Sequence, residues 1–277
     1  MRCEGREESP RGGSDVAAER RGGETARVAE AVLTIYPGRD GLPSPSPPCT
    51  KVFLALRYCG LPHRVVAPKG DPRRASPTRR LPALALGGEV LCDSVRILDR
   101  LEALETPRSW APKEPRERAR DRAWELFANE HLYWRGVYLR WVEPENAART
   151  VRRVLPPFPA PLRALVGRLA VRTARRRARG QGIGLFSRER VRDDVLRALD
   201  TYEEALGEGP FLEERDRPGR ADFAAAAHLP QFTYAGISPW AAERLRERPR
   251  LCAYVGRVYE ACDLPAPDGL GLRSEQA

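Results

Sequence analysis

Residues 31–60 read AVLTIYPGRDGLPSPSPPCTKVFLALRYCG, and most of the N-terminal architecture follows from them. Residues 31–36 form a short apolar run stopped by a Pro-Gly pair, which predicts a buried β-strand. The next segment, 42–48, holds four prolines and must be a loop, because proline lacks the backbone donor that strands and helix interiors require. Helical apolar spacing then covers 49–59, and Gly60 suits the C-terminal end of that helix.

Further along the chain, short strand and helix signals continue to alternate. Residues 63–66 predict a second strand, and the runs 81–86 and 89–91 flank a Gly-Gly pair that is typical of a β-hairpin. Asp93-Ser94 then opens another helix. The order strand, helix, strand, hairpin, helix predicts a small α/β domain over 31–105.

Strand signals end beyond residue 105. Residues 106–115 contain three prolines and predict a linker, and helical patterns follow over 116–264. The two ends, 1–30 and 265–277, are expected to be disordered tails, the first because it has scarcely a large apolar residue. The predicted fold class is therefore α/β followed by an all-helical domain.

Composition narrows the class of protein. The chain has 277 residues, of which 42% are hydrophobic and 31% charged, enough for packed cores and an aqueous surface. It lacks both a long apolar run and a signal core, so we expect a cytoplasmic protein without a membrane span. The six cysteines form no C-x-x-C pair and there are three histidines, so we expect reduced thiols and no metal.

The net charge of +10 has one source. Residues 149–179 contain ten arginines and no acidic residue. Only three of the 48 basic residues are lysines, a bias that a GC-rich genome produces without any ligand. We interpret the segment as a solvated helix face, with a polyanion or partner site as the alternative. Because no nucleic-acid-reading motif accompanies it, the sequence does not favour nucleic acid as a partner.

Two groups of motifs resemble a known family. Ser46-Pro47-Pro48-Cys49 at a helix start, Leu81-Pro82 before a hairpin and Asp93-Ser94 at the next helix resemble the glutathione-transferase fold, in which a thioredoxin-like domain precedes a helical one. The helical half resembles the branch related to failed axon connections and metaxin proteins. Its motifs are Glu130-His131-Leu132-Tyr133-Trp134, Arg140-Trp141, Gly180-Gln181-Gly182-Ile183-Gly184 and Arg220-Ala221-Asp222. The resemblance covers about residues 31–262.

The resemblance implies that the protein binds glutathione and activates its thiol for conjugation to a small hydrophobic electrophile. Ser46 is the implied catalytic residue, because a hydroxyl at a helix N-terminus donates to the sulfur and the helix dipole favours a thiolate. Since Ser46 replaces the first cysteine of a C-x-x-C pair, disulfide chemistry is lost. Tyr36 and Cys49 are alternatives in the same corner of the domain, where the first predicted strand ends and the first predicted helix begins. A simple helix cap is the structural interpretation of Ser46.

The implied glutathione-binding residues are Arg80, Leu81, Pro82, Asp93 and Ser94. A cis bond is expected before Pro82, presenting the backbone of Leu81 to the cysteinyl unit of glutathione. The helix start at Asp93-Ser94 offers N–H groups to the γ-glutamyl carboxylate, with a plain capping role as the alternative. Arg80 is expected to pair with a carboxylate of the ligand.

An aromatic stripe on the first helix of the second domain is the expected second-substrate pocket. Phe127, His131, Trp134 and Tyr138 recur at helical spacing, although such a stripe is also typical of core. A homodimer is an expectation from the family. A catalytically silent binding or protein-interaction module of the metaxin and failed axon connections type stays open as the alternative function.

A last motif concerns stability rather than chemistry. Asp222 corresponds to the carboxylate of a capping box in glutathione transferases, three residues after the cap. The cap position is Gly219, which has no side chain to complete the box. We therefore expect Asp222 to be structural.

Overall fold

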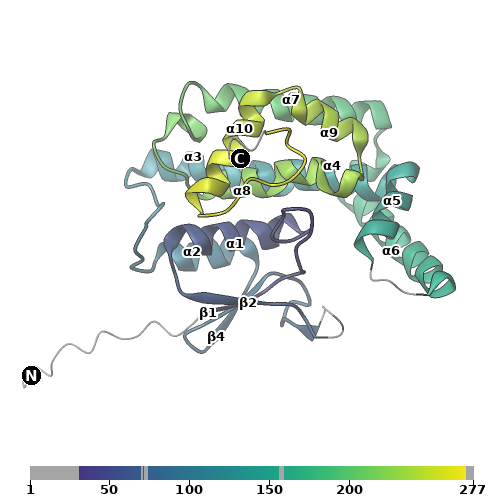
Figure 1. Cartoon of the computed structure of the whole chain (residues 1–277), viewed down its shortest axis with the longest axis horizontal. Helices are drawn as coiled ribbons and strands as arrows, with labels where there is room; N and C mark the ends of the chain where they lie inside the picture. Colours follow the sequence, from purple (N-terminus) through teal and green to yellow (C-terminus); the bar gives the residue numbers. More distant parts are fainter. Residues whose placement is uncertain (1–30, 70, 72–73, 156–158, 273–277) are drawn as a thin grey trace, which may run out of the picture.

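The structure is a computed structural model that describes residues 31–69, 71, 74–155 and 159–272. The predicted N-terminal tail lies outside the described residues. In Figure 1 the sheet forms the lower layer, and helices α1 and α2 lie between it and the helical part of the chain. The large cavity described below lies where these two parts meet.

The N-terminal part is built on a sheet of four short strands. They are β1 (Ala31–Thr34), β2 (His63–Val66), β3 (Ala83–Leu86) and β4 (Glu89–Cys92), in the order β2-β1-β3-β4. Strand β1 pairs in parallel with β2, whereas β1–β3 and β3–β4 are antiparallel. Helices α1 (Pro47–Cys59) and α2 (Ser94–Glu102) complete this part, so the predicted order of strands and helices is confirmed.

The rest of the described chain is helical. Its first long helix runs without a break through α3 (Pro115–Leu126), the π-helical turn η2 (Phe127–Leu132), α4 (Tyr133–Val137) and a second π-helical turn η3 (Tyr138–Val142). The remaining elements are α5 (Pro144–Val154), α6 (Ala160–Gln181), η4 (Ile183–Leu185), α7 (Arg188–Leu206), η5 (Leu212–Glu214), α8 (Arg220–His228), η6 (Leu229–Phe232), η7 (Tyr234–Gly236), α9 (Pro239–Arg246) and α10 (Pro249–Ala261).

Three boundaries differ from the prediction. Pro115 is the first residue of α3 rather than the end of a linker, a position where proline costs no hydrogen bond. The helical pattern over 240–261 predicts one helix, but the chain leaves helical geometry before Pro249 and forms α9 and α10 instead. Residues 265–272, predicted to be part of a disordered tail, instead pack against the helical part. Leu270 is buried in the core, and the carbonyl of Gly269 accepts a hydrogen bond from Arg246 Nε at 2.7 Å.

A buried network of charges joins the two parts. Glu125 of α3 accepts hydrogen bonds from Lys51 Nζ of α1 at 2.6 Å and from Arg220 Nε of α8 at 2.7 Å. Arg220 also reaches Asp99 and Glu102 of α2, at 3.0 and 3.1 Å. Lys51 and Arg220 are fully buried, and desolvation lowers the pKa of Lys51 although Glu125 opposes this. Such charges are tolerated in a protein interior only when they are paired.

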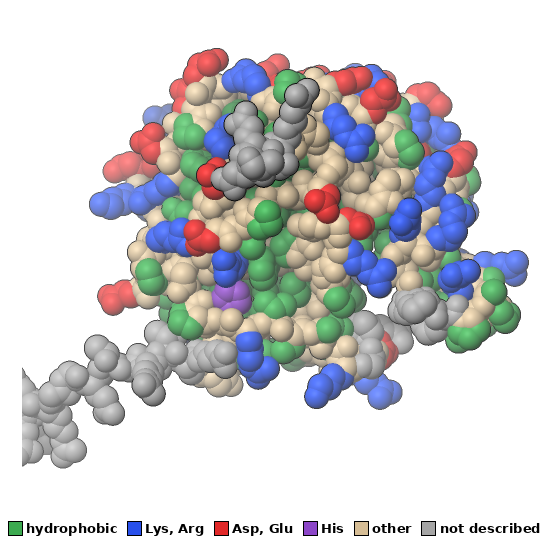
Figure 2. Space-filling view, viewed as in Figure 1, with side chains coloured by type: hydrophobic (Ala, Val, Ile, Leu, Met, Phe, Trp, Pro, Cys, Tyr) green, Lys and Arg blue, Asp and Glu red, His purple; other side chains and the backbone are tan. Residues whose placement is uncertain are grey.

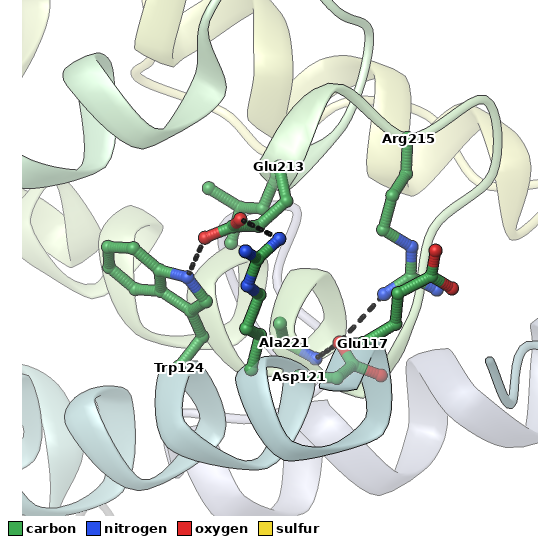
Figure 3. Close-up of a pocket in the computed structure, with 8 residues that line it drawn as sticks. Glu117, Asp121, Trp124, Glu213, Arg215 and Ala221 are labelled. Atoms are coloured by element: carbon green, nitrogen blue, oxygen red, sulfur yellow. Dashed lines mark hydrogen bonds and ion pairs between the residues drawn. The ribbon is translucent and has the colours of Figure 1, made fainter. Parts of the chain in front are cut away.

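At the start of α8, two carboxylates accept the backbone N–H groups that a cap residue would help to satisfy. The Gly219 N–H donates to Asp222 Oδ2 at 2.8 Å, which is half of the expected capping box. The other half comes from α3, because Asp121 Oδ1 accepts the N–H of Ala221 at 3.0 Å. Arg215 holds Asp121 in place through an ion pair at 2.9 Å (Figure 3). A carboxylate from another helix therefore takes the role of the cap side chain.

This arrangement predicts that Gly219→Ser destabilises the protein. Serine is normally a slightly better cap than glycine. A Cβ at residue 219, however, would lie 2.6 Å from both terminal nitrogens of Arg215 and 2.8 Å from Asp121 Oδ2. We expect the free energy of unfolding, measured by urea denaturation, to fall by about 1–3 kcal/mol. Gly180→Ser is the matched control, because a Cβ there meets no atom within 4 Å; a gain in stability from Gly219→Ser would contradict this account of the cap.

Candidate functional site

A cavity of about 710 Å³ lies between the N-terminal part and the helical part. In the N-terminal part its walls come from the segment after β1, the start of α1 and the loop after β2. In the helical part they come from the stretch between η2 and η3, from α5 and α6, and from the stretch between the end of α8 and η7. Most of the lining is apolar, with polar groups from Ser46, Arg140, His228 and Gln231 among others. A largely apolar cavity with a few polar groups is the usual form of a small-molecule site. The hollow in Figure 3 is smaller, about 70 Å³, and is crossed by the ion pairs of Asp121 and Glu213.

Ser46 lines this cavity, and its hydroxyl does not cap the helix. It stands at the N-cap of α1 with extended backbone geometry but makes no side-chain cap hydrogen bond. The reason is local. Pro47 and Pro48 carry no N–H, and the N–H groups of Cys49 and Thr50 both donate to the Ser46 carbonyl at 3.0 Å. The Ser46 hydroxyl is therefore free of capping at the end of α1 that borders the cavity, and the Cys49 thiol is its partner within the protein.

The other two candidates in the corner differ in their surroundings. Tyr36 is half-buried and lines the cavity, and burial raises the pKa of its phenol, so it stays a neutral hydrogen-bond donor. Cys49 is fully buried. Burial raises the pKa of its thiol to about 11, although hydrogen bonds from Ser46 and Ser44 act in the opposite direction. At neutral pH Cys49 is thus a packed thiol, which argues against it as a nucleophile.

The strand register brings the predicted glutathione-binding residues toward the same corner. The Leu81–Pro82 bond is cis, as predicted. Thr34 lies opposite Ala83, so the antiparallel register, extended by two residues, would place Leu81 opposite Tyr36. Ala83 in turn lies opposite Cys92, and the same extension would place Ser94 beside Leu81. The extended register would thus put these residues at the ends of the strands next to Tyr36, and none of them is part of the cavity wall.

The Asp93 side chain already forms local hydrogen bonds, whereas only the backbone of Arg80 does so. Asp93 has φ +79°, a rare backbone conformation for a residue other than glycine, and its Oδ1 accepts the N–H groups of Val95 and Arg96 at 2.9 and 3.4 Å. The capping role therefore holds for Asp93, and the buried Ser94 is the first residue of the helix. The side chain of Arg80 is exposed, while its backbone N–H donates to Ser76 Oγ at 3.0 Å.

The predicted second-substrate stripe does not line the cavity, which corrects that expectation. Phe127 stacks on His131 with ring centroids 4.8 Å apart and also contacts Tyr202 of α7. Trp134 and Tyr138 pack in a second apolar cluster that includes residues from α6, η4 and α7. Spacing identified a real face of the helix, but it is the face that packs on other helices.

The opposite face of the same helix forms the cavity wall. It presents Tyr133, Gly136, Val137 and Arg140, together with Trp141. The sequence signal for this face was weak because a glycine and an arginine interrupt its apolar pattern. The two π-helical turns lie on either side of α4, and such turns are frequent at functional sites.

Arg140 is a buried charge in the cavity wall, and the sequence had singled it out only as part of a motif. Its NH1 donates to the Pro45 carbonyl at 3.0 Å, beside Ser46, and its NH2 donates to the Gln231 side chain. The guanidinium lies 5.1 Å from the centre of the Tyr234 ring. Burial lowers the pKa of Arg140 to about 10, and it forms no ion pair with any carboxylate in the described part of the chain. It therefore places a positive charge in the wall of a largely apolar cavity, close to Ser46.

His228 is a second cavity residue that the sequence did not indicate. Its Nδ1 lies 2.7 Å from the Ala224 carbonyl, whereas Nε2 is buried without a hydrogen-bond partner. Burial lowers the pKa of His228 to about 3, so the ring is neutral across the physiological range. Its contribution to the cavity is a neutral aromatic edge and not a charge.

The described residues contain no group of three or more His, Cys, Asp or Glu side chains arranged to hold a metal ion. Over the same residues, no helix combines the length and apolar character needed to cross a membrane.

Comparison with known proteins agrees with this architecture. Residues 47–146 match the family described as glutathione S-transferase N-terminal domain. A stretch of 104 residues is 32% identical to glutathione S-transferase theta-1 of Mus musculus, covering 34% of this chain and 40% of the mouse protein. The match thus spans about two fifths of the length of that relative.

Several solved structures share the fold at low sequence identity. β-etherase LigF from Sphingobium sp. strain SYK-6 has a TM-score of 0.59 at 20% identity, over 84% of this chain and 97% of the other. Rice GST1, solved in complex with glutathione, has a TM-score of 0.55 at 21% identity, over 86% and 92%. Human glutathione transferase theta-2, solved with glutathione and an unknown ligand, has a TM-score of 0.54 at 20% identity, over 84% and 82%. The chain therefore has the glutathione-transferase fold.

Proposed function

We propose that this protein binds glutathione and activates its thiol, through the Ser46 hydroxyl, for conjugation to a small hydrophobic electrophile held in the large cavity. The observation that carries the proposal is the position of Ser46. The residue lines the cavity at the positive end of α1, and its hydroxyl is free of the capping role. The cavity is large and apolar enough for a second substrate beside the sulfur.

The chemistry follows from the charges around that hydroxyl. A Ser46 O–H donating to the sulfur stabilises the thiolate relative to the thiol, and the dipole of α1 and the charge of Arg140 act in the same direction. Lowering the thiol pKa by about two pH units raises the thiolate fraction about a hundredfold at a pH well below the pKa. The thiolate then attacks the electrophilic carbon, a C–S bond forms, and the leaving group departs with its electron pair.

The remaining contacts hold glutathione in place. In the proposal the backbone of Leu81 pairs with the cysteinyl unit beside Pro82, and the N–H and hydroxyl of Ser94 bind the γ-glutamyl carboxylate. The positive φ of Asp93 supports this assignment, because strained residues concentrate at ligand sites. Arg80, with its exposed side chain, pairs with a carboxylate of the ligand. Rice GST1 and human theta-2, which share the fold, were solved with glutathione.

A second candidate is a catalytically silent binding or protein-interaction module of the metaxin and failed axon connections type. One observation favours it. The Ser46 hydroxyl lies within hydrogen-bonding reach of the buried Cys49 thiol, so it has an internal partner that competes with a bound sulfur.

A cytoplasmic location and a homodimer belong to the first proposal as family expectations.

Isothermal titration with glutathione tests the binding half of the proposal. We expect saturable binding to the wild-type protein and a loss of affinity of about tenfold or more in Ser94→Ala, because a hydrogen bond to a charged group is removed. Ser187→Ala is the matched control, since Ser187 caps α7 away from the site and should leave the affinity unchanged. Absence of binding would overturn the proposal, and binding without conjugation would support the second candidate.

A further inference from the structure

Helix α6 carries an unusual combination of exposed charge and exposed apolar surface. Its 22 residues include no acidic residue. Its basic residues are Arg163, Arg168, Arg172, Arg175, Arg176, Arg177 and Arg179. Leu162, Leu165 and Leu169 are 44%, 56% and 56% exposed, among the most exposed large apolar side chains of the described chain. A helix packed as a core element does not leave three leucines in water.

The leucines form one stripe on the side turned away from the protein. Gly167 and Ala178 are the buried residues of α6 and mark its packed side. At about 100° per residue, Leu169 lies half a turn from Ala178, and Leu162 and Leu165 lie on the same side as Leu169. Figure 1 shows α6 extending outward at the right edge of the molecule, and Figure 2 shows hydrophobic side chains among Lys and Arg there.

The arginines of α6 are not neutralised within the protein. In the described residues none of them forms an ion pair, and Arg175 donates to the Val142 carbonyl at 3.2 Å. By contrast, Arg120 and Arg122 of α3 pair with Glu213 and Asp99. The charge on α6 therefore faces solvent and is available to an anionic partner.

We propose that α6 docks in the plane of an anionic lipid surface, with the leucine stripe inserted and the arginines at the headgroup phosphates. A basic amphipathic helix with an apolar stripe has the form that interfacial binding requires. Arginine side chains can extend from the edges of the stripe toward phosphates. A nucleic acid would leave the leucines without a partner, and a second copy of α6 would bring like charges together. Lipid binding at α6 does not depend on glutathione chemistry in the cavity.

Vesicle flotation tests the proposal with the full-length protein. The vesicles are phosphatidylcholine alone, or equal parts of phosphatidylcholine and phosphatidylserine. Because each arginine at an anionic surface contributes about fivefold in affinity, we expect Arg168→Gln with Arg172→Gln to weaken binding about twentyfold. Leu165→Ser with Leu169→Ser should weaken it about tenfold or more. The matched controls are Arg100→Gln with Arg116→Gln for charge and Leu126→Ser for exposed leucine, and both should bind as wild type does.

Flotation, DNA binding and the oligomeric state of the same variants together decide which partner α6 takes. Binding to the phosphatidylserine vesicles alone, weakened by high salt and by both α6 pairs, supports the proposal. No binding, or equal effects of α6 and control variants, overturns it. Tight binding to duplex DNA that does not require the leucines would assign α6 to a nucleic acid instead. Conversion of a wild-type dimer to a monomer by the leucine pair would assign the stripe to a second copy. Circular dichroism confirms that the variants remain folded.

Discussion

Ser46→Ala is expected to lower kcat/KM for glutathione conjugation about a hundredfold, because the hydroxyl that stabilises the developing thiolate is lost. Because the Ser46 side chain makes no cap hydrogen bond to α1 and contacts only the Cys49 thiol there, we expect the variant to stay folded. The measurement uses an activated aryl chloride such as chlorodinitrobenzene as the electrophile. Thermal unfolding of the variant should match that of the wild type closely.

Two companion variants separate the role of Ser46 from that of its neighbours. Ser46→Thr keeps a hydroxyl and should recover most of the activity. Tyr36→Phe removes the other hydroxyl among the corner candidates, and we expect it to leave kcat/KM within about threefold of wild type, well short of the effect of losing a transition-state donor. If Tyr36→Phe abolished conjugation and Ser46→Ala did not, the tyrosine alternative would replace the serine one.

Glu125→Gln is expected to have the largest effect on stability. The carboxylate of Glu125 is shared by Lys51 and Arg220, which are both fully buried. Removing its charge leaves two cations inside the protein without their common partner, and breaking a buried pair in this way costs about 3–5 kcal/mol. We expect urea denaturation to show a loss of that order in the free energy of unfolding.

The control for this prediction is a surface ion pair. Glu247→Gln removes one of the two carboxylate partners of Arg244 at the exposed end of α9, where ion pairs contribute about 1 kcal/mol or less. Lys51→Met combined with Glu125→Leu should recover part of the loss, because it removes one buried cation together with the carboxylate. A Glu125→Gln protein as stable as the Glu247→Gln protein would show that the network does not hold the two parts together.

Local sequence signals predicted the fold well. Proline positions, the Gly-Gly hairpin and the apolar runs each specify a local structure that tertiary contacts did not override, so the strand and helix order of residues 31–102 is correct. Apolar residues at helical spacing also predicted the long helix that begins at Pro115, to within one residue of its start. Its break into π-helical turns was not visible, because a single inserted residue leaves the apolar spacing nearly unchanged.

The site was predictable only where the signal is local. The Ser46 position follows from a proline-rich loop entering a helix, and the cis bond at Pro82 from the fold that the motifs resembled. Which face of the first helix of the C-terminal part borders the cavity depends on packing against α7, so the aromatic stripe was assigned to the wrong side. Arg140 and His228 reach the cavity from elements far apart in sequence, and no spacing rule links them to Ser46.

The same limit applies to the charge network and the α8 cap. Lys51, Glu125 and Arg220 are ordinary residues in ordinary helices until α1, α3 and α8 come together. The sequence shows that Gly219 has no side chain to complete the capping box. Asp121, nearly a hundred residues earlier in the chain, supplies the missing acceptor. Compensation of this kind between distant residues has no sequence signature.

The measurement that bears most directly on Ser46 is a pH titration of the ultraviolet absorbance of the thiolate of bound glutathione. We predict that the bound thiol in the wild-type protein titrates about two pH units below free glutathione. In Ser46→Ala we expect the pKa of the bound thiol to return most of the way to that of free glutathione. A bound thiol that titrates with the pKa of free glutathione in the wild-type protein would contradict thiol activation at this corner.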